Sequence, residues 1–233
     1  MCLNCVWEKS APSRRSVLFG GLAALTASAL PAFAQEQAAV SPDEALQRLV
    51  EGNARYLAGR RTHTDFSAGR AARALTQRPF AAILSCADSR VAPELAFDQG
   101  PGDLFVVRVA GNFVNDDGLA SLEYAINFLE TPLIMVLGHS NCGAVDAAIK
   151  VVRDGLELPG HLPEMIEPIR PAAETALAQS PADPLGAAIS ANVHNAVARL
   201  EAAEPILAAR VKSQSLRIVG ARYDLETGQV ALL

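Results

Sequence analysis

The sequence predicts an α/β fold: a mostly parallel central β-sheet of four parallel strands plus a C-terminal edge strand, flanked by helices and preceded by an N-terminal helical arm. Short apolar runs bounded by breaker residues recur along the chain, which is typical of strands buried on both faces. Segments with one apolar face at helical spacing alternate with these runs. The 233 residues, half of them hydrophobic, suffice for a sizeable core.

The first 34 residues differ in kind from the rest. Arg14 and Arg15 precede an apolar run that ends in the small-x-small pattern of residues 32–34, and the segment resembles a twin-arginine export signal. We therefore expect a cleaved signal peptide over residues 1–34, a single mature domain over residues 35–233 and a periplasmic location in a bacterium. The apolar run is short for a membrane span, so no stable membrane anchor is expected after cleavage; an uncleaved anchor is the alternative.

The expected elements follow in chain order. Ser41-Pro42-Asp43-Glu44 combines an N-cap, a proline at the first helical position and a capping-box glutamate, so an arm helix should run from Ser41 to Gly59. Asp116 or Asp117 should cap a later helix that ends near Leu129. Further helices are expected at 68–75, from 93, from 143, up to about 179 and over 184–200, and strands at 80–85, 104–109, 132–138, 215–220 and from about 230.

Two polar motifs directly follow two of the apolar runs. Cys86-Ala87-Asp88-Ser89-Arg90 follows the first, and His139-Ser140-Asn141-Cys142 follows the third. In a parallel sheet both motifs fall at the carboxyl ends of strands, where open α/β sheets bind ligands. Thiolate and imidazole are preferred ligands of tetrahedral zinc, so we predict a site of Cys86, His139 and Cys142. The alternative is a Cys86–Cys142 disulfide beside an ordinary histidine.

The predicted site leaves a fourth zinc position for water or for Asp88. Zinc lowers the pKa of a bound water, and the resulting hydroxide can attack a small electrophilic carbon. Arg90 lies two residues beyond Asp88, so its guanidinium could hold that carboxylate, which would then orient the hydroxide. A released Asp88 could instead become the fourth ligand and close the site. A purely structural salt bridge is the alternative for this pair.

Charge and cysteine content narrow the possible partners. The net charge is −5 and the basic residues are scattered, so nucleic acid is not the expected partner. Only Cys86 and Cys142 remain after removal of residues 1–34. The predicted zinc-bound hydroxide instead indicates a small-molecule substrate.

Cys-x-Asp-Ser-Arg followed by His-x-x-Cys resembles the signature of the β-class carbonic anhydrases. This resemblance implies zinc on Cys86, His139 and Cys142, an Asp88–Arg90 dyad, and reversible hydration of carbon dioxide to bicarbonate and a proton by zinc-bound hydroxide. It covers nearly all of the domain at 35–233. Further matching segments are residues 101–108, 110–112, 138–143 and 223–224.

The chain is most similar to the plant-type branch, which implies four substrate-side residues. Gln77 would hydrogen-bond the substrate, Phe105 and Tyr124 would line an apolar pocket partly supplied by a neighbouring subunit, and Gly143 would lie beside the last ligand. The resemblance also implies self-association as a dimer or higher oligomer, with the arm helix embracing a second subunit. Two alternatives keep the same zinc centre: hydrolysis of carbonyl sulfide or carbon disulfide, and a closed structural zinc site without catalysis.

Overall fold

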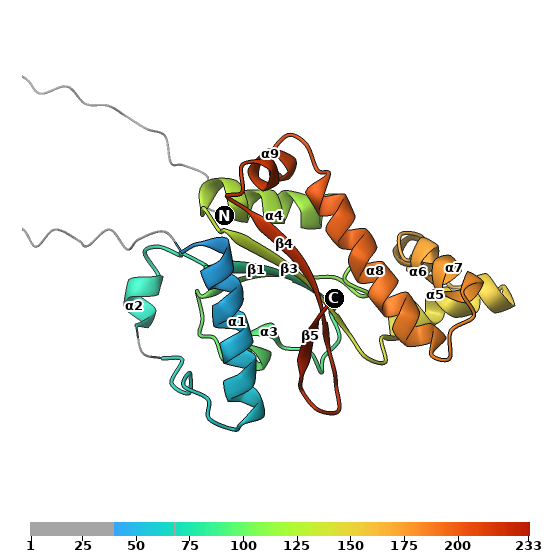
Figure 1. Ribbon diagram of the computed structural model, residues 1–233, viewed down its shortest axis with the longest axis horizontal. Helices are drawn as coiled ribbons and strands as arrows, with labels where there is room; N and C mark the ends of the chain where they lie inside the picture. The colour runs from blue at the N-terminus through green and yellow to red at the C-terminus, as the bar shows by residue number, and fades with distance from the viewer. Residues whose placement is uncertain (1–39, 68) are drawn as a thin grey trace, which may run out of the picture. The chain divides into compact units, whose positions relative to one another are not determined.

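The structure is a computed structural model that describes residues 40–67 and 69–233 (Figure 1). Its centre is a five-stranded sheet of order β2-β1-β3-β4-β5. The first four strands run parallel and the last is antiparallel to β4, which confirms the predicted fold class. The strands are β1 (Ala81–Ser85), β2 (Leu104–Arg108), β3 (Leu133–His139), β4 (Arg217–Tyr223) and β5 (Val230–Leu232).

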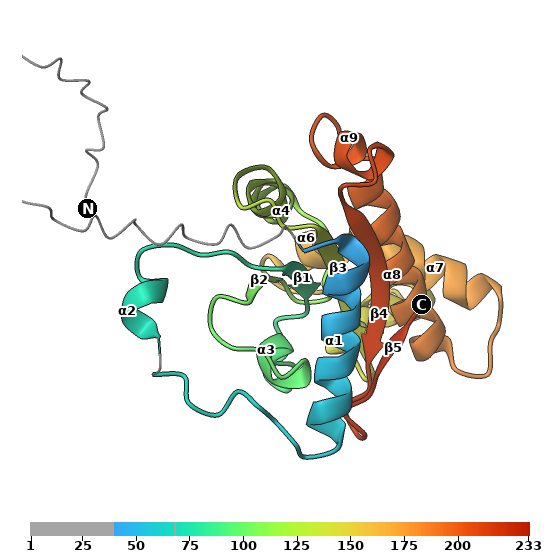
Figure 2. The same ribbon diagram turned by 60° about the vertical axis from the view of Figure 1, so that its left-hand side comes forward.

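Helices cover both faces of the sheet, because alternate side chains of the buried strands point to opposite faces. Ile83 and Met135 pack against one helical layer, whereas Ala82 and Ile134 pack against the other. Figure 2 shows α1 and α8 on opposite sides of β4. One layer contains α1 (Pro42–Leu57) and α3 (Pro93–Ala96), and the other contains α4 (Asp116–Phe128), α8 (Pro184–Glu201) and α9 (Leu207–Lys212).

A third apolar cluster lies beyond the carboxyl ends of β1 and β3. It joins both cysteines to buried side chains of several helices, including Val145, Ile169 and Ile189. On the side that faces these helices, the predicted metal site therefore packs against buried apolar side chains. The contributing helices are α5 (Gly143–Asp154), α6 (Leu162–Ile166), α7 (Arg170–Ala178) and α8; a short helix, α2 (Arg70–Arg73), lies earlier in the chain.

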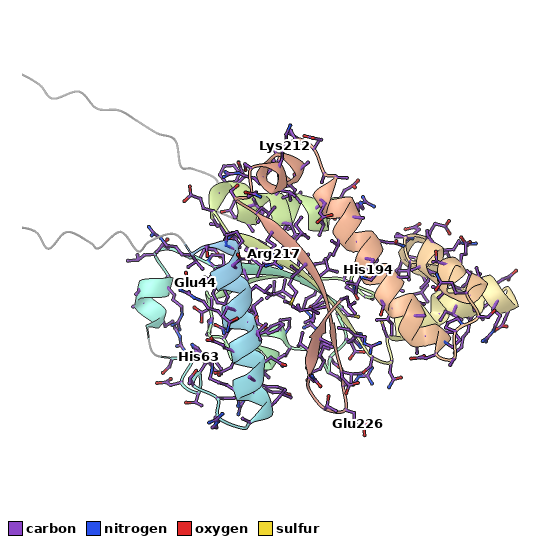
Figure 3. The ribbon with its side chains drawn as sticks, in the orientation of Figure 1. Glu44, His63, His194, Lys212, Arg217 and Glu226 are labelled. Atoms are coloured by element: carbon purple, nitrogen blue, oxygen red, sulfur yellow. The ribbon has the colours of Figure 1, made fainter. Side chains whose placement is uncertain are left out.

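The N-terminus of α1 forms largely as its sequence predicts. Ser41 is the N-cap, and its hydroxyl oxygen accepts a hydrogen bond from the Glu44 N–H at 3.2 Å. The Glu44 carboxylate, however, accepts from Arg48 at 2.6 Å. The hydrogen bond from the Glu44 N–H to the Ser41 hydroxyl is thus the half of the capping box that forms. Glu44 is labelled in Figure 3, near Arg217 of β4, which pairs with Asp43 at 2.6 Å.

Several expectations about the helices were wrong. The N-cap of α4 is Asn115, whose side chain accepts from the Gly118 N–H at 2.9 Å, and neither Asp116 nor Asp117 has that role. The segment expected to form one helix up to about residue 179 forms α6 and α7. Helix α9 was not predicted from the sequence.

The predicted export signal at 1–34 lies outside the described residues, so the division at residue 34 stays a prediction. Within residues 40–67 and 69–233, no helix is both long and apolar enough to span a bilayer.

Candidate metal centre

The three predicted zinc ligands lie together at one end of the sheet. Cys86 follows β1 directly, His139 is the last residue of β3, and Cys142 is the N-cap residue of α5. Because β1 and β3 are paired neighbours, their carboxyl ends bring the two motifs together. One ligand atom from each residue lies within 4.8 Å of the other two. Cys86 is 4% exposed, Cys142 1% and His139 0%.

The imidazole of His139 is oriented as a metal ligand requires. Its Nδ1 lies 2.8 Å from the carbonyl oxygen of Ser140, which can only accept, so Nδ1 carries the proton. Nε2 then has a free lone pair. This Nε2 is buried and has no hydrogen-bond partner among the described residues. Since a buried polar atom without a partner is costly, the arrangement fits a bound metal ion.

Both cysteines are free thiols in the structure, so the Cys86–Cys142 disulfide, the alternative to a metal site, is not formed. A hydrogen bond between the two thiols is the main cause that lowers the pKa of Cys86, and it outweighs burial, which alone would raise that pKa. The same hydrogen bond, together with burial, raises the pKa of Cys142. The pair therefore holds one readily formed thiolate in a buried place. Two sulfurs and one imidazole nitrogen form a donor set that suits zinc.

Asp88 and Arg90 form a two-pronged ion pair beside the three ligands. Arg90 Nε donates to Asp88 Oδ1 at 2.9 Å and Nη2 donates to Oδ2 at 2.7 Å. The Arg90 backbone N–H also donates to Oδ1, at 2.9 Å. The side-chain hydrogen bond from Arg90 is the largest cause that holds the pKa of Asp88 well below its usual range. Asp88 Oδ2 lies 3.9 Å from His139 Nε2, so an ionised carboxylate borders the predicted metal position.

Arg108 supports the loop that carries Cys86 and Asp88, a contact that the sequence interpretation missed. Its Nε donates to the Cys86 carbonyl at 3.0 Å, and its Nη2 donates to the Asp88 carbonyl at 2.7 Å. The Gly111 N–H donates to Cys86 Sγ at 3.2 Å. Both residues lie in segments already matched by the resemblance, but only the tertiary structure shows what they touch.

The four predicted substrate-side residues lie in three different parts of the structure. Gly143 is the first residue of α5, directly after Cys142, and open space lies where a side chain would begin. Phe105 of β2 and Tyr124 of α4 lie together, with ring centroids 6.3 Å apart. Gln77 is exposed on the loop before β1. The structure thus brings Gly143 to the metal centre and pairs the two aromatic rings.

Other histidines lie outside this centre. Figure 3 labels His63, on the loop after α1, and His194, on α8. His63 Nδ1 lies 3.6 Å from Asp98 Oδ1, and His194 is exposed. Among the described residues, Cys86, His139 and Cys142 form the one group of three His, Cys, Asp or Glu side chains close enough to share a metal ion.

Comparisons with known proteins agree with this geometry. A family model described as carbonic anhydrase matches residues 81–230. Carbonic anhydrase 2 of Mycobacterium tuberculosis (strain H37Rv) is 42% identical over 195 residues, which cover 82% of this chain and 93% of the relative. The carbonic anhydrase of Mycolicibacterium smegmatis is 38% identical over 196 residues, with 82% and 93% covered.

Solved structures show the same likeness in three dimensions. The β-carbonic anhydrase CcaA has a TM-score of 0.65 and 29% identity, covering 80% of this chain and 86% of its own. A Coccomyxa β-carbonic anhydrase in complex with acetazolamide has a TM-score of 0.64 and 29% identity, covering 81% and 86%.

Proposed function

This chain belongs to the carbonic anhydrase family, as a β-class enzyme that interconverts carbon dioxide and bicarbonate, and we propose that Cys86, His139 and Cys142 hold the zinc ion on which its activity depends. One observation supports this proposal most: His139 Nε2 is buried without a hydrogen-bond partner among the described residues, in a group whose ligand atoms lie within 4.8 Å of one another. When bound, zinc supplies Lewis acidity that makes water a nucleophile near neutral pH.

Asp88 orients the attacking water in this proposal. Its carboxylate is held ionised by Arg90, so Oδ2 can accept a hydrogen bond from a water near His139, 3.9 Å away. Arg90 engages both carboxylate oxygens of Asp88, and Asp88 is not a member of the ligand group of Cys86, His139 and Cys142. A zinc site with three protein ligands keeps an open position, which favours catalysis over the closed structural alternative.

The substrate side is completed by a second subunit. Tyr124 is 46% exposed and Phe128, whose ring centroid lies 5.4 Å from that of Tyr124, is 69% exposed. Large aromatic side chains left in water beside the edge strand β2 are typical of an interface. Phe105 and Tyr124 would then line an apolar pocket of the neighbouring subunit, with Gln77 donating to the substrate and Gly143 giving it access to the metal. Self-association as a dimer or higher oligomer follows from this arrangement.

Export to the periplasm is a separate proposal, supported by the sequence of residues 1–34 alone. Expression with Arg14 and Arg15 both changed to Lys should retain the uncleaved protein in the cytoplasm. The unchanged chain should yield a periplasmic protein that begins near Gln35. Sequencing of the N-terminus in each cell fraction tests both statements, and an unchanged chain that stays cytoplasmic and uncleaved would contradict them.

Stopped-flow hydration of carbon dioxide, with zinc quantified in the same preparation, tests the proposed function. One zinc per chain with saturable hydration supports it, and His139→Ala should lose both zinc and activity. Stoichiometric zinc with background hydration would favour a closed structural site. Faster hydrolysis of carbonyl sulfide than hydration of carbon dioxide in the same preparation would assign the sulfur substrate instead.

A further inference from the structure

The sulfur of Cys86 has a backbone donor that lies on a different strand's loop. Gly111 follows β2 and donates its N–H to Cys86 Sγ at 3.2 Å. A thiolate that binds a metal carries excess negative charge, and N–H donors both stabilise that charge and fix the direction of the sulfur lone pairs. The position of the Gly111 peptide therefore influences how Cys86 presents its sulfur.

Gly111 cannot hold that position by itself. Its φ of +83° lies in the left-handed region, and a Cβ at this place would collide with Ile169 Cδ1. Glycine is thus required, but it has no side chain with which to fix the loop. The carbonyl oxygen of Gly111 accepts a hydrogen bond from Asn192 Nδ2 at 2.7 Å.

Asn192 is an unusual residue for its place in the fold. It lies on α8 and is 2% exposed, and its buried neighbours on that helix, such as Ile189 and Val193, are apolar. A buried amide costs free energy unless it is hydrogen-bonded, whereas an apolar side chain would fill the same space without that cost. Packing alone therefore does not explain the Asn192 amide. Its Nδ2 donates a hydrogen bond to the Gly111 carbonyl oxygen.

We propose that Asn192 is a positioning residue for the zinc centre: its amide fixes the Gly111 peptide, which holds the Cys86 sulfur in the orientation that binds the metal. The inference rests on the proposed zinc site. Helix α8 supplies no ligand of that site. Through Asn192 and Gly111 it is nevertheless connected to the Cys86 sulfur by two hydrogen bonds. Asn192 itself touches neither the substrate nor the reacting atoms.

The experiment compares zinc release from the zinc-loaded wild type, Asn192→Asp and Asn192→Ala to a chromophoric chelator in excess. Asn192→Asp preserves the shape but replaces the N–H donor with a carboxylate oxygen, and Asn192→Ala removes the contact. We expect each variant to release zinc about 10- to 100-fold faster, because loss of outer-shell partners weakens metal affinity by a factor of this size. The sulfur-to-cobalt charge-transfer bands of the cobalt-substituted variants should shift as well.

Two controls on the same helix separate positioning from general stability. Asn195→Asp makes the same chemical change at an exposed position and should leave zinc release unchanged. Leu200→Ala opens a cavity at a buried position eight residues beyond Asn192, and it should lower thermal stability without speeding zinc release.

Wild-type release rates and unshifted cobalt bands in both Asn192 variants would overturn the inference. Leu200→Ala releasing zinc as fast as Asn192→Ala would overturn it too, because general loosening would then suffice. A wild-type protein that holds no zinc at all would instead overturn the proposed function.

Discussion

In the proposed function Asp88 orients the attacking water and Arg90 holds the Asp88 carboxylate, although neither residue is one of the three proposed metal ligands. Their contact has the geometry of a guanidinium fork on a carboxylate, with two side-chain hydrogen bonds of 2.9 and 2.7 Å. The ion pair keeps the carboxylate ionised and engages both of its oxygens. It should therefore control activity and leave metal binding largely intact.

Asp88→Asn and Arg90→Ala should each lower kcat/KM for carbon dioxide hydration by about 100-fold or more, because the acceptor for the water is lost or misplaced. Zinc content should stay near one per chain. Stopped-flow kinetics and elemental analysis of one preparation measure both quantities.

Arg153→Ala provides the matched control for this prediction. The Arg153 guanidinium donates two hydrogen bonds of 2.8 Å to the Asp154 carboxylate, in the same fork geometry. This ion pair lies at the exposed end of α5. Its removal should leave kcat/KM unchanged. Equal losses in Arg153→Ala and Arg90→Ala would show that the effect of Arg90 is not specific to the metal centre.

At the scale of whole elements, α1 is attached to the rest of the fold by a few buried polar contacts. Asn53 Nδ2 donates to the carbonyl oxygens of Ala96 and Gly228, both at 2.9 Å, and its Oδ1 accepts from the Val230 N–H at 3.0 Å. One side chain thus joins α1 to α3 and to the β4–β5 turn. On this helix the apolar Val50 is 46% exposed, whereas the polar Asn53 is 5% exposed.

Asn53→Ala should lower the free energy of unfolding by about 3 kcal/mol, since it leaves two buried carbonyl oxygens and the partly buried Val230 N–H without their Asn53 partner. Urea unfolding followed by circular dichroism measures the change. Gln47→Ala, which removes an exposed contact with Glu51 on the same helix, should change stability by less than about 0.5 kcal/mol. A loss at Asn53 no larger than that at Gln47 would mean that α1 is held by apolar packing alone.

Asp98 fixes the loop that follows α1. Its side chain is fully buried and accepts from Arg55 Nε at 2.6 Å and from Thr62 Oγ1 at 2.8 Å. Burial alone would raise the pKa of Asp98, but the hydrogen bonds from Arg55, Thr62 and His63 outweigh it and hold that pKa below its ordinary value of 3.8. Since the folded pKa is lowered, the ionised carboxylate stabilises the fold fully above pH 3.8, and this contribution is lost as the pH falls below that value.

Asp98→Asn should therefore be less stable than the wild type at pH 6, and the difference should shrink as the pH falls towards 3. Urea midpoints of both proteins at each pH measure that difference, in which the shared effects of acid on the zinc ligands cancel. A difference that stays constant over this pH range would assign the role of Asp98 to shape instead of charge.

Local sequence patterns predicted the strands and the grouping of Cys86, His139 and Cys142 at one end of the sheet, because each motif directly follows a strand. The apolar runs before Cys86 and His139 form buried strands. Thiolate and imidazole are the ligand types that zinc sites use, so the motifs at the ends of these strands indicated a metal site. The N-cap of α4 was not predictable in the same way. Asn115, Asp116 and Asp117 are all good capping residues, and only the backbone path selects the first.

The supporting contacts of the centre were beyond sequence reasoning for a different reason. Asn192 meets Gly111 across 81 residues of chain, and Arg108 reaches back 22 residues to the carbonyl of Cys86. The local sequence around Asn192 and Arg108 does not show which distant groups these side chains contact. Such pairs follow from the packing of elements, which residue types and spacing do not specify.

For the whole molecule, the aromatic patch formed by Phe105, Tyr124 and Phe128 is the feature that a single chain leaves unexplained. The rings lie in contact, yet Phe128 remains 69% exposed. In the proposed oligomer this patch is covered by a second copy and contributes to its pocket.

Phe128→Asp should therefore shift the protein to a monomer and reduce hydration of carbon dioxide, because a charge cannot be buried in an apolar interface without a partner. Sedimentation velocity together with stopped-flow kinetics tests this. Leu156→Asp, at a residue 42% exposed just after α5, should leave the assembly intact. An unchanged oligomer in Phe128→Asp would place the interface elsewhere.

Zinc K-edge X-ray absorption on the purified, active protein tests the central claim most directly. Our account predicts a four-coordinate zinc with two sulfur ligands at about 2.3 Å, one imidazole nitrogen at about 2.0 Å and one further light-atom ligand. A spectrum without sulfur ligands, or one unaltered by Cys142→Ser, would contradict it.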